Sequence, residues 1–153
     1  MPIALEAANQ PDVIALIDAL DAYQKPLYPP ESHHGIDITA LSRPEVLFAV
    51  ARDDSGQAVG CGAIVVGPAF GEIKRMYVLP SQRGRGLSKA LLTFLEAQAQ
   101  ARGCHQFMLE TGPLQLEALG LYERMGYQRR GPFGNYGDDP HSVYMAKAAV
   151  GAA

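Results

Sequence analysis

A short basic turn with two glycines, Arg83-Gly84-Arg85-Gly86, carries the residues of this chain that are best suited to chemistry. It follows a strand-like run that stops at Pro80 and leads directly into a segment with a helical stripe of apolar residues. Glycine lets backbone N–H groups approach a ligand closely, and the first N–H groups of a helix have no partner inside it. The arginines add forked, charge-assisted donors. The segment therefore predicts a site for a bound phosphate or pyrophosphate.

Two common phosphate-binding loops do not fit this turn. A Walker loop requires Gly-x-x-x-x-Gly-Lys-Ser/Thr, whereas the nearby Lys89 follows Ser88 and not glycine. A dinucleotide loop requires Gly-x-Gly-x-x-Gly, and here Lys89 stands where the third glycine must allow close packing of helix and strand. A nucleotide-dependent enzyme is therefore disfavoured.

A third loop, that of the GNAT acetyltransferases, has the pattern Arg/Gln-x-x-Gly-x-Gly/Ala. Residues 83–88 resemble it at every position but the last, where Ser88 replaces glycine or alanine. Residues 110–127 resemble the second signature of the family, a strand end followed by a helix that carries Ala118, Tyr122, Gly126 and Tyr127. The chain thus resembles a GNAT protein over residues 46–147, and residues 1–153 are expected to form a single N-acetyltransferase domain around this core.

The resemblance implies an α/β (α+β) fold, the GNAT acyl-CoA N-acyltransferase fold, in which helices flank a mixed, mostly antiparallel central sheet. The apolar periodicity agrees with this order of elements. It predicts helices over residues 11–23, 37–41, 86–102 and 113–125, and strands over residues 3–7, 46–51, 58–66, 71–79, 105–110, 127–130 and 142–147. Proline and glycine predict loops over residues 25–35 and 131–140.

The resemblance also implies an acetyl-CoA-dependent N-acetyltransferase. In this activity a primary amine of a small-molecule or amino acid-like acceptor attacks the thioester directly, in a ternary complex. Acetyl-CoA is then the acetyl donor, and no metal is required. The alternative is a non-catalytic acyl-CoA-binding sensor or regulatory module, since the same phosphate loop serves both. The two differ in their need for catalytic side chains.

Two residues are the catalytic candidates. An amine with a pKa of about 10.4 is almost entirely protonated at pH 7, so a base must remove a proton. The resemblance assigns this role to Glu72 on the predicted strand; the alternative is that Glu72 only pairs with Lys74 or Arg75. It assigns the general acid, which protonates the departing thiolate of coenzyme A, to Tyr122. The alternative for Tyr122 is a half-buried core aromatic.

The remaining site residues follow from the same resemblance. The pantetheine arm of the cofactor is expected to pair with the backbone of a strand that splays from its neighbour at a bulge. The cofactor-binding residues are Met76, Tyr77, Val78, Arg83, Gly84, Arg85, Gly86, Leu87, Ser88 and Gln115. The acceptor candidates are Tyr28, His33, Phe133 and Tyr136. The adjacent His33 and His34 point apart in a loop and lack a spaced set of further ligands, so no metal site is expected.

Composition sets the remaining limits. The chain has 153 residues, of which 48% are hydrophobic and 19% charged, the size and balance of one globular domain. The formal net charge of −3 gives no overall attraction to nucleic acid or to an anionic membrane. The first residues lack the basic and long apolar regions of a signal peptide, so a cytoplasmic location is expected. A small-molecule amine is the expected partner, and the sequence leaves open whether the chain forms a homodimer.

Overall fold

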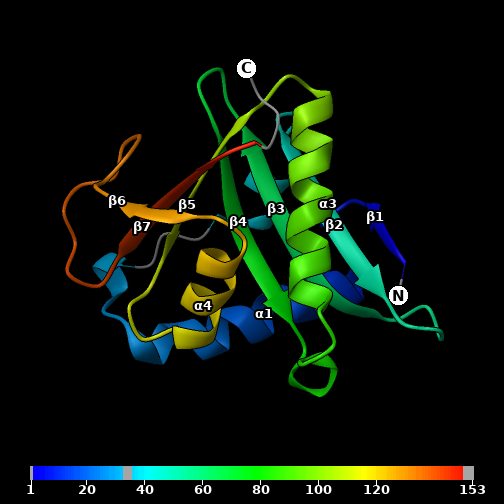
Figure 1. The fold of residues 1–153 in the computed structure, drawn as a ribbon. Helices are drawn as coiled ribbons and strands as arrows, with labels where there is room; N and C mark the ends of the chain where they lie inside the picture. Colours follow the sequence, from blue (N-terminus) through cyan, green and yellow to red (C-terminus); the bar gives the residue numbers. More distant parts are fainter. Residues whose placement is uncertain (1, 33–35, 150–153) are drawn as a thin grey trace.

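One sheet of seven strands organises the computed structural model, which describes residues 2–32 and 36–149 (Figure 1). The strands are β1 (Ile3–Leu5), β2 (Val46–Arg52), β3 (Ala58–Val66), β4 (Gly71–Val78), β5 (Gln106–Thr111), β6 (Gln128–Arg130) and β7 (Val143–Ala148). Their order across the sheet is β1-β2-β3-β4-β5-β7-β6. Only the β4–β5 pair among these is parallel. A parallel pair needs a long crossover connection, and a helix provides it here.

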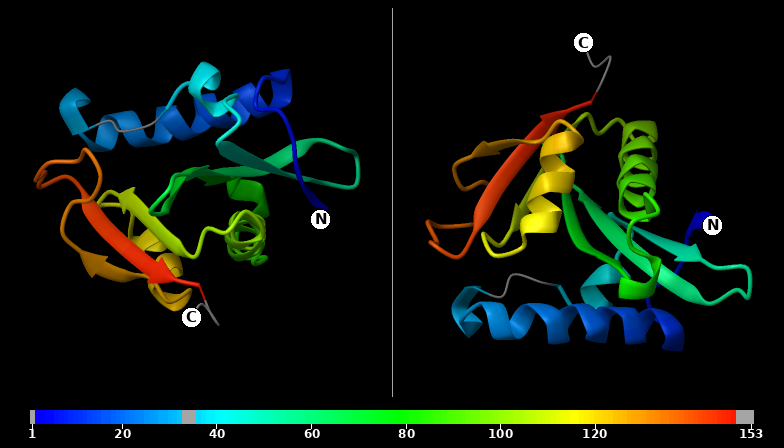
Figure 2. Two further views of the ribbon diagram at one scale, coloured as in Figure 1. Left: turned by 90° about the horizontal axis from the view of Figure 1, so that it is seen from above. Right: turned by 60° about the horizontal axis from the view of Figure 1, so that its bottom comes forward.

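Helices cover both faces of the sheet (Figure 2). They are α1 (Pro11–Gln24), α2 (Ile38–Leu41), α3 (Leu87–Ala101) and α4 (Leu116–Arg124). The helices α1 and α2 lie on one face, and α3, which connects β4 to β5, lies with α4 on the other. The predicted fold class, a mixed and mostly antiparallel sheet flanked by helices, is confirmed.

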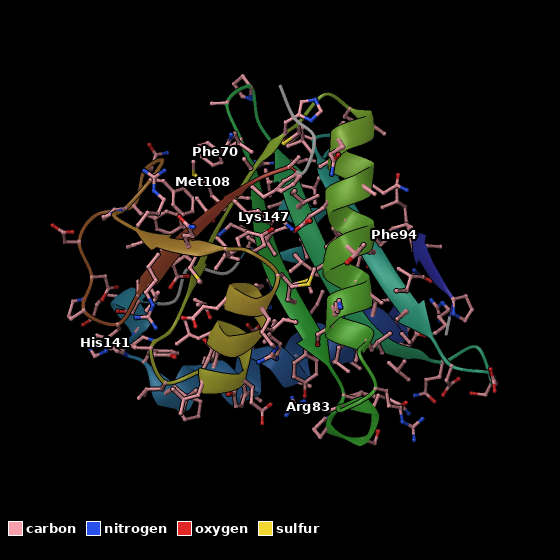
Figure 3. The ribbon with its side chains drawn as sticks, in the orientation of Figure 1. Phe70, Arg83, Phe94, Met108, His141 and Lys147 are labelled. Carbon is pink, nitrogen blue, oxygen red and sulfur yellow. The ribbon has the colours of Figure 1, made fainter. Side chains whose placement is uncertain are left out.

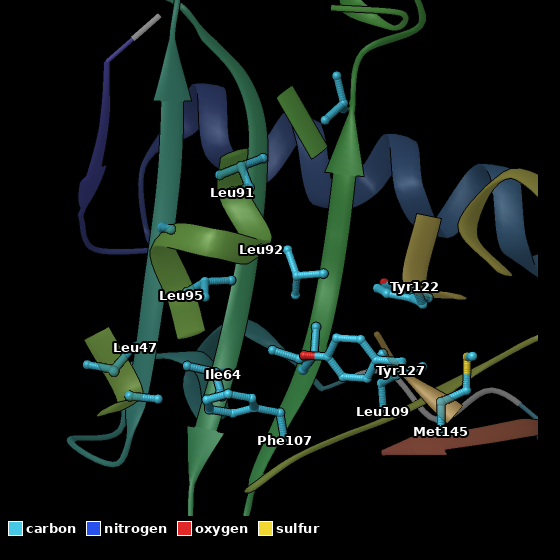
Figure 4. Close-up of a cluster of buried hydrophobic side chains, with 14 of the residues drawn as sticks. Leu47, Ile64, Leu91, Leu92, Leu95, Phe107, Leu109, Tyr122, Tyr127 and Met145 are labelled. Atoms are coloured by element: carbon cyan, nitrogen blue, oxygen red, sulfur yellow. The ribbon is translucent and has the colours of Figure 1, made fainter. Parts of the chain in front are cut away.

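Strand alternation divides the buried residues between the two faces. On β2, Leu47 and Ala49 join the cluster under α3 and α4, whereas Phe48 and Val50 face α1 and α2. Successive side chains of a strand point to opposite faces, so a strand covered on both sides is apolar throughout. Figure 4 shows the first cluster, in which leucines of α3 pack over the strands and Tyr122 of α4 lies beside Tyr127.

A β-bulge interrupts β4. In the register of β3 with β4, Cys61 stands opposite Tyr77 and Ala63 opposite Lys74, which leaves two residues of β4 facing Gly62. Those two residues are Arg75 and Met76, and Arg75 has a φ of 59°, in the left-handed region. A Cβ on Gly62 would stand 2.2 Å from the sulfur of Met76, so glycine gives the bulged strand room.

The same strand parts from β5 just before the bulge. The parallel ladder joins Gly71 to Phe107, Glu72 to Met108 and Ile73 to Leu109, and it ends there. Beyond Ile73, the edge of β4 that faces β5 has no strand partner in the described part of the chain. The bulge and the splay expected from the family resemblance are therefore both present, and they open the sheet at its centre.

Most predicted elements agree with the structure to within two residues, with two exceptions. The helix predicted over residues 113–125 begins only at Leu116, because residues 112–115 form a turn in which Gln115 Oε1 accepts from the Gly112 N–H at 3.1 Å. The loop predicted over residues 25–35 contains two short 3₁₀ helices, Lys25–Leu27 and Pro30–Ser32. Within residues 2–32 and 36–149, no helix is long and apolar enough to cross a membrane.

Candidate active site

A cavity of about 120 Å³ opens where β4 and β5 part, between residues of α1 and residues of α4. We call it the central cavity. Its lining includes Leu20, Asp21, Lys25, Tyr28, Glu72, Lys74, Arg75, Met76, Glu110, Gln115, Ala118 and Tyr122. These residues come from α1 and the segment after it, from β4, from the end of β5 and from α4. The splay of the sheet thus gathers polar side chains from four regions of the chain.

A larger groove of about 630 Å³ runs from the end of β4 past the basic turn to the start of α3. We call it the turn groove. Of the predicted cofactor-binding residues, it is lined by Met76, Tyr77, Val78, Arg83, Gly84, Gly86, Leu87, Ser88 and Gln115. Arg85 is exposed and is not part of this lining. Met76, Gln115 and Tyr122 line both spaces, so the turn groove and the central cavity meet there.

The start of α3, directly after the basic turn, presents backbone N–H groups that have no hydrogen-bond partner in the described part of the chain. Gly84 and Gly86 have φ values of 80° and 74°, and no other atom lies within 4 Å of where their Cβ would stand. The first bond of α3 runs from the Ala90 N–H to the Gly86 carbonyl, and no side chain caps the helix. The N–H groups of residues 87–89 are therefore available to a ligand, and the helix dipole favours an anion there.

Arg83 has a further role in the turn. Its Nε donates to the Val78 carbonyl at 3.2 Å, and its guanidinium lies 5.7 Å from the centre of the Tyr77 ring. Figure 3 shows Arg83 at the end of β4, beside the turn. The side chain thus stabilises the end of β4 and also adds positive charge to the turn groove.

Glu72 lies in a compact cluster with Lys74 and Tyr136. The Tyr136 hydroxyl donates to Glu72 Oε2 at 2.5 Å, and Lys74 Nζ lies 3.1 Å from the same oxygen. Lys74 also donates to the Tyr136 oxygen at 2.9 Å. Burial, with the hydrogen bond to Glu72, raises the pKa of Tyr136, so this phenol keeps its proton. The ion pair that the sequence offered as an alternative is present, and Glu72 nevertheless lines the central cavity.

Tyr122 lies at the junction of the two spaces and is 6% exposed. Its ring packs edge-on against Tyr127, with the ring centres 5.8 Å apart (Figure 4). Burial raises the pKa of Tyr122, and the negative charge of Glu110 raises it further. The hydroxyl therefore stays protonated at neutral pH, which is the state that a general acid requires.

The acceptor candidates lie in different places. Tyr28 lines the central cavity, and its hydroxyl is 3.4 Å from Gln115 Oε1. Tyr136 lines a separate hollow of about 590 Å³ on the other side of Glu72. Phe133 is 5% exposed, lines none of the three spaces, and packs edge-on against Tyr136 and other aromatic rings. Its role in acceptor binding stays a prediction. His33 falls outside the described residues.

Sequence reasoning did not place Asp21, Lys74, Arg75 and Glu110 in the cavity, although it named Lys74 and Arg75 as alternative ion-pair partners of Glu72. One signal was available, since the adjacent Lys74 and Arg75 break the alternation expected of a half-buried strand. Within residues 2–32 and 36–149, no group of three or more histidine, cysteine, aspartate or glutamate residues is placed to hold a metal ion.

Comparison with known proteins adds four findings. The model of the acetyltransferase (GNAT) family matches residues 15–127. An IAA acetyltransferase of Azospirillum brasilense is 45% identical over 147 residues, which is 95% of each chain. A crystal structure from Klebsiella pneumoniae, described as an acyl-CoA N-acyltransferase, matches with a TM-score of 0.82 and 43% identity over 96% of both chains. An aminoglycoside 6'-N-acetyltransferase complexed with coenzyme A shares the fold, with a TM-score of 0.75 and 21% identity over 100% of this chain and 99% of its own.

Proposed function

The chain belongs to the acetyltransferase (GNAT) family, and from this premise we propose that it transfers an acetyl group from acetyl-CoA to a primary amine. The acceptor is a small molecule or is amino acid-like. The observation that carries the proposal is the junction of the turn groove with the central cavity at Met76 and Tyr122. One space offers donors to an anion, and the other holds carboxylates that suit an amine. We further propose that the chain acts as a single domain.

The turn groove is the proposed donor site. The N–H groups of residues 84–89 would bind the pyrophosphate of acetyl-CoA, as helix N-termini bind anions. The open edge of β4 beyond Ile73 would pair with the pantetheine arm, as an added strand would. An arm that follows β4 from the turn toward the bulge reaches Met76 and Tyr122, where the groove meets the cavity.

The central cavity is the proposed acceptor site. The amine nitrogen attacks the thioester carbon, Glu72 takes the amine proton directly or through a water, and Tyr122 donates its proton to the sulfur as the carbon–sulfur bond breaks. Backbone N–H groups of β4 beside the splay would stabilise the negative charge on the carbonyl oxygen. Lys74 and Tyr136 hold the Glu72 carboxylate in place.

A screen of amines tests the proposal, with release of free thiol from acetyl-CoA as the readout. Glu72→Gln keeps the shape of the side chain but cannot accept a proton. With an accepted amine, it should lower turnover by roughly 10²–10⁴-fold, the usual range for a lost general base, and leave acetyl-CoA affinity unchanged. Glu123→Gln, at an exposed carboxylate on α4, is the matched control. Turnover of Glu72→Gln within twofold of the wild type would remove Glu72 from the mechanism.

The alternative, a non-catalytic acyl-CoA sensor, predicts a different result in the same experiment. A sensor would bind acetyl-CoA and release no thiol with any amine. A pure binding module also has no use for a carboxylate in the cavity or for a protonated phenol at the junction. Failure to bind coenzyme A at all would overturn both functions.

A further inference from the structure

Arg75 lies in the wall of the central cavity because of the bulge in β4. In a regular strand, Lys74 and Arg75 would point to opposite faces of the sheet. Here Lys74 reaches Glu72, and Arg75 reaches Asp21 of α1, so both side chains lie on the α1 side. A bulge redirects a side chain in this way, and a left-handed φ at a non-glycine residue is a strained conformation that is found most often at functional sites.

The Arg75 guanidinium is buried and has few partners. The residue is 8% exposed, and an ion pair joins its Nη2 to Asp21 Oδ1 at 2.9 Å. Its Nε is buried without a hydrogen-bond partner in the described part of the chain. Asp21 itself remains 35% exposed. An arginine has five N–H donors, and buried donors of a charged group are rarely left unpaired. The arrangement therefore leaves capacity for a second anion on the cavity side.

Among the described residues, the acidic and basic side chains that line the central cavity are equal in number. Asp21, Glu72 and Glu110 are acidic, and Lys25, Lys74 and Arg75 are basic. Glu72 already has Lys74 and Tyr136 as partners, so its negative charge is compensated within the protein. Arg75 follows Lys74 on β4 and precedes Met76, which lies at the junction with the turn groove. A ligand with both a positive and a negative group would complement this lining better than a simple amine.

We propose that Arg75 binds a carboxylate of the acceptor, and that the acceptor is an aminocarboxylate, a small compound that carries a carboxylate near its primary amine. This proposal rests on the proposed acetyl transfer. The planar fork of arginine matches a carboxylate with two parallel hydrogen bonds. With the carboxylate on Arg75, the amine lies between Glu72 and the junction with the turn groove. The volume of about 120 Å³ suits a small acceptor.

The competing explanation is that Arg75 only joins α1 to β4 through Asp21. The two explanations differ in what happens when each partner is removed. If Arg75 is only a link, Asp21→Asn and Arg75→Gln should have the same effect on every substrate. If Arg75 binds the acceptor, Asp21→Asn leaves the cation in place and only Arg75→Gln changes the choice of acceptor. Glutamine is unbranched, so it is no more strained than arginine at the left-handed position.

The test compares each accepted amino acid with its carboxamide, which keeps the amine and the shape and lacks the negative charge. The readout is the ratio of kcat/KM for the acid to kcat/KM for the amide. The wild type should favour the acid, and Arg75→Gln should lower the ratio by roughly 10–100-fold, as expected for a hydrogen-bonded charge. Arg75→Lys should lower the ratio less, and Asp21→Asn should preserve it. Melting temperatures confirm that all variants fold.

A binding measurement without acetyl transfer distinguishes failure of the carboxylate site from failure of the proposed acetyltransferase function. Amino acids are titrated calorimetrically into the protein saturated with coenzyme A. Binding that Arg75→Gln abolishes supports the carboxylate site even where no acetyl transfer is seen. The proposal is overturned if the wild type prefers amides, if Arg75→Gln lowers both rates equally, or if no carboxylate binds.

Discussion

Replacing Tyr122 tests the general acid and the core in one pair of variants. Tyr122→Phe keeps the ring and its edge-on contact with Tyr127, and removes only the hydroxyl. The structure records no hydrogen bond of this hydroxyl within residues 2–32 and 36–149, so its loss leaves no described group unpaired. Stability should then stay within about 0.5 kcal/mol of the wild type. Tyr122→Ala removes a buried ring and should cost about 3–5 kcal/mol.

These free energies translate into melting temperatures. For a chain of this size, 1 kcal/mol shifts the melting temperature by roughly 2–4 °C, so Tyr122→Ala should lower it by about 6–20 °C. The expected effect of Tyr122→Phe on the chemical step is a loss of about 10²-fold. We expect the lower end of the usual range because a thiolate leaves readily without full protonation.

Differential scanning calorimetry and single-turnover kinetics with saturating acetyl-CoA measure the two effects separately. The reasoning fails if Tyr122→Phe transfers acetyl groups at the wild-type rate, since Tyr122 is then only a core aromatic. It also fails if Tyr122→Phe alone loses several degrees of melting temperature, because the hydroxyl would then have a structural partner. Donors with a poorer leaving thiol should show a larger effect of the missing hydroxyl.

Two further predictions concern the turn and the N-terminal region. Gly86→Val places a β-branched residue at a φ of 74°, in a turn where no other atom lies close to the new side chain. It should weaken coenzyme A binding at least tenfold in calorimetry while the protein stays folded, and an unchanged affinity would refute the donor site. Hydrogen bonds from Arg52 lower the pKa of Glu6 and of Asp12 below their ordinary values of 4.5 and 3.8, so both carboxyls stabilise the fold at neutral pH and lose that contribution as the pH falls through their lowered pKa values. Arg52→Met should therefore lower the melting temperature at pH 7, and the difference from the wild type should shrink as the pH falls below these ordinary values, whereas a difference independent of pH would contradict the pairing.

Local patterns predicted most of the fold. The strand over residues 58–66 has the bounds expected from its turn signals and β-branched residues, and α1 extends the predicted helix by one residue. The basic turn can be recognised in the sequence because the two glycines on which its proposed role depends, Gly84 and Gly86, are only two positions apart. Each of these features follows from a few consecutive residues, so the sequence determines it without knowledge of the fold.

The acceptor side of the site depends on contacts that sequence spacing does not reveal. Asp21 and Arg75 meet across 54 positions, and an alternating strand would place Arg75 on the wrong face. The bulge reverses that expectation, and the glycine that leaves room for it, Gly62, lies on a different strand. Phe133 stands in a segment rich in glycine and proline that predicts an exposed loop, yet it packs into a cluster of aromatic rings. Residues brought together by tertiary packing were therefore the ones that sequence reasoning missed.

The short ladder between β4 and β5 has a consequence for the order of events in catalysis. Three residue pairs join the two halves of the sheet, and beyond them the edge of β4 has no strand partner in the described part of the chain. A donor molecule lying along that edge would complete the sheet and stiffen one wall of the space where the acceptor binds. We expect the amide hydrogens of this edge to exchange faster with solvent in the free protein than in the complex with the donor. Binding would therefore follow a compulsory order in which the donor binds first. The wall of the acceptor site beside β4 is complete only after the donor has paired with the open edge of that strand.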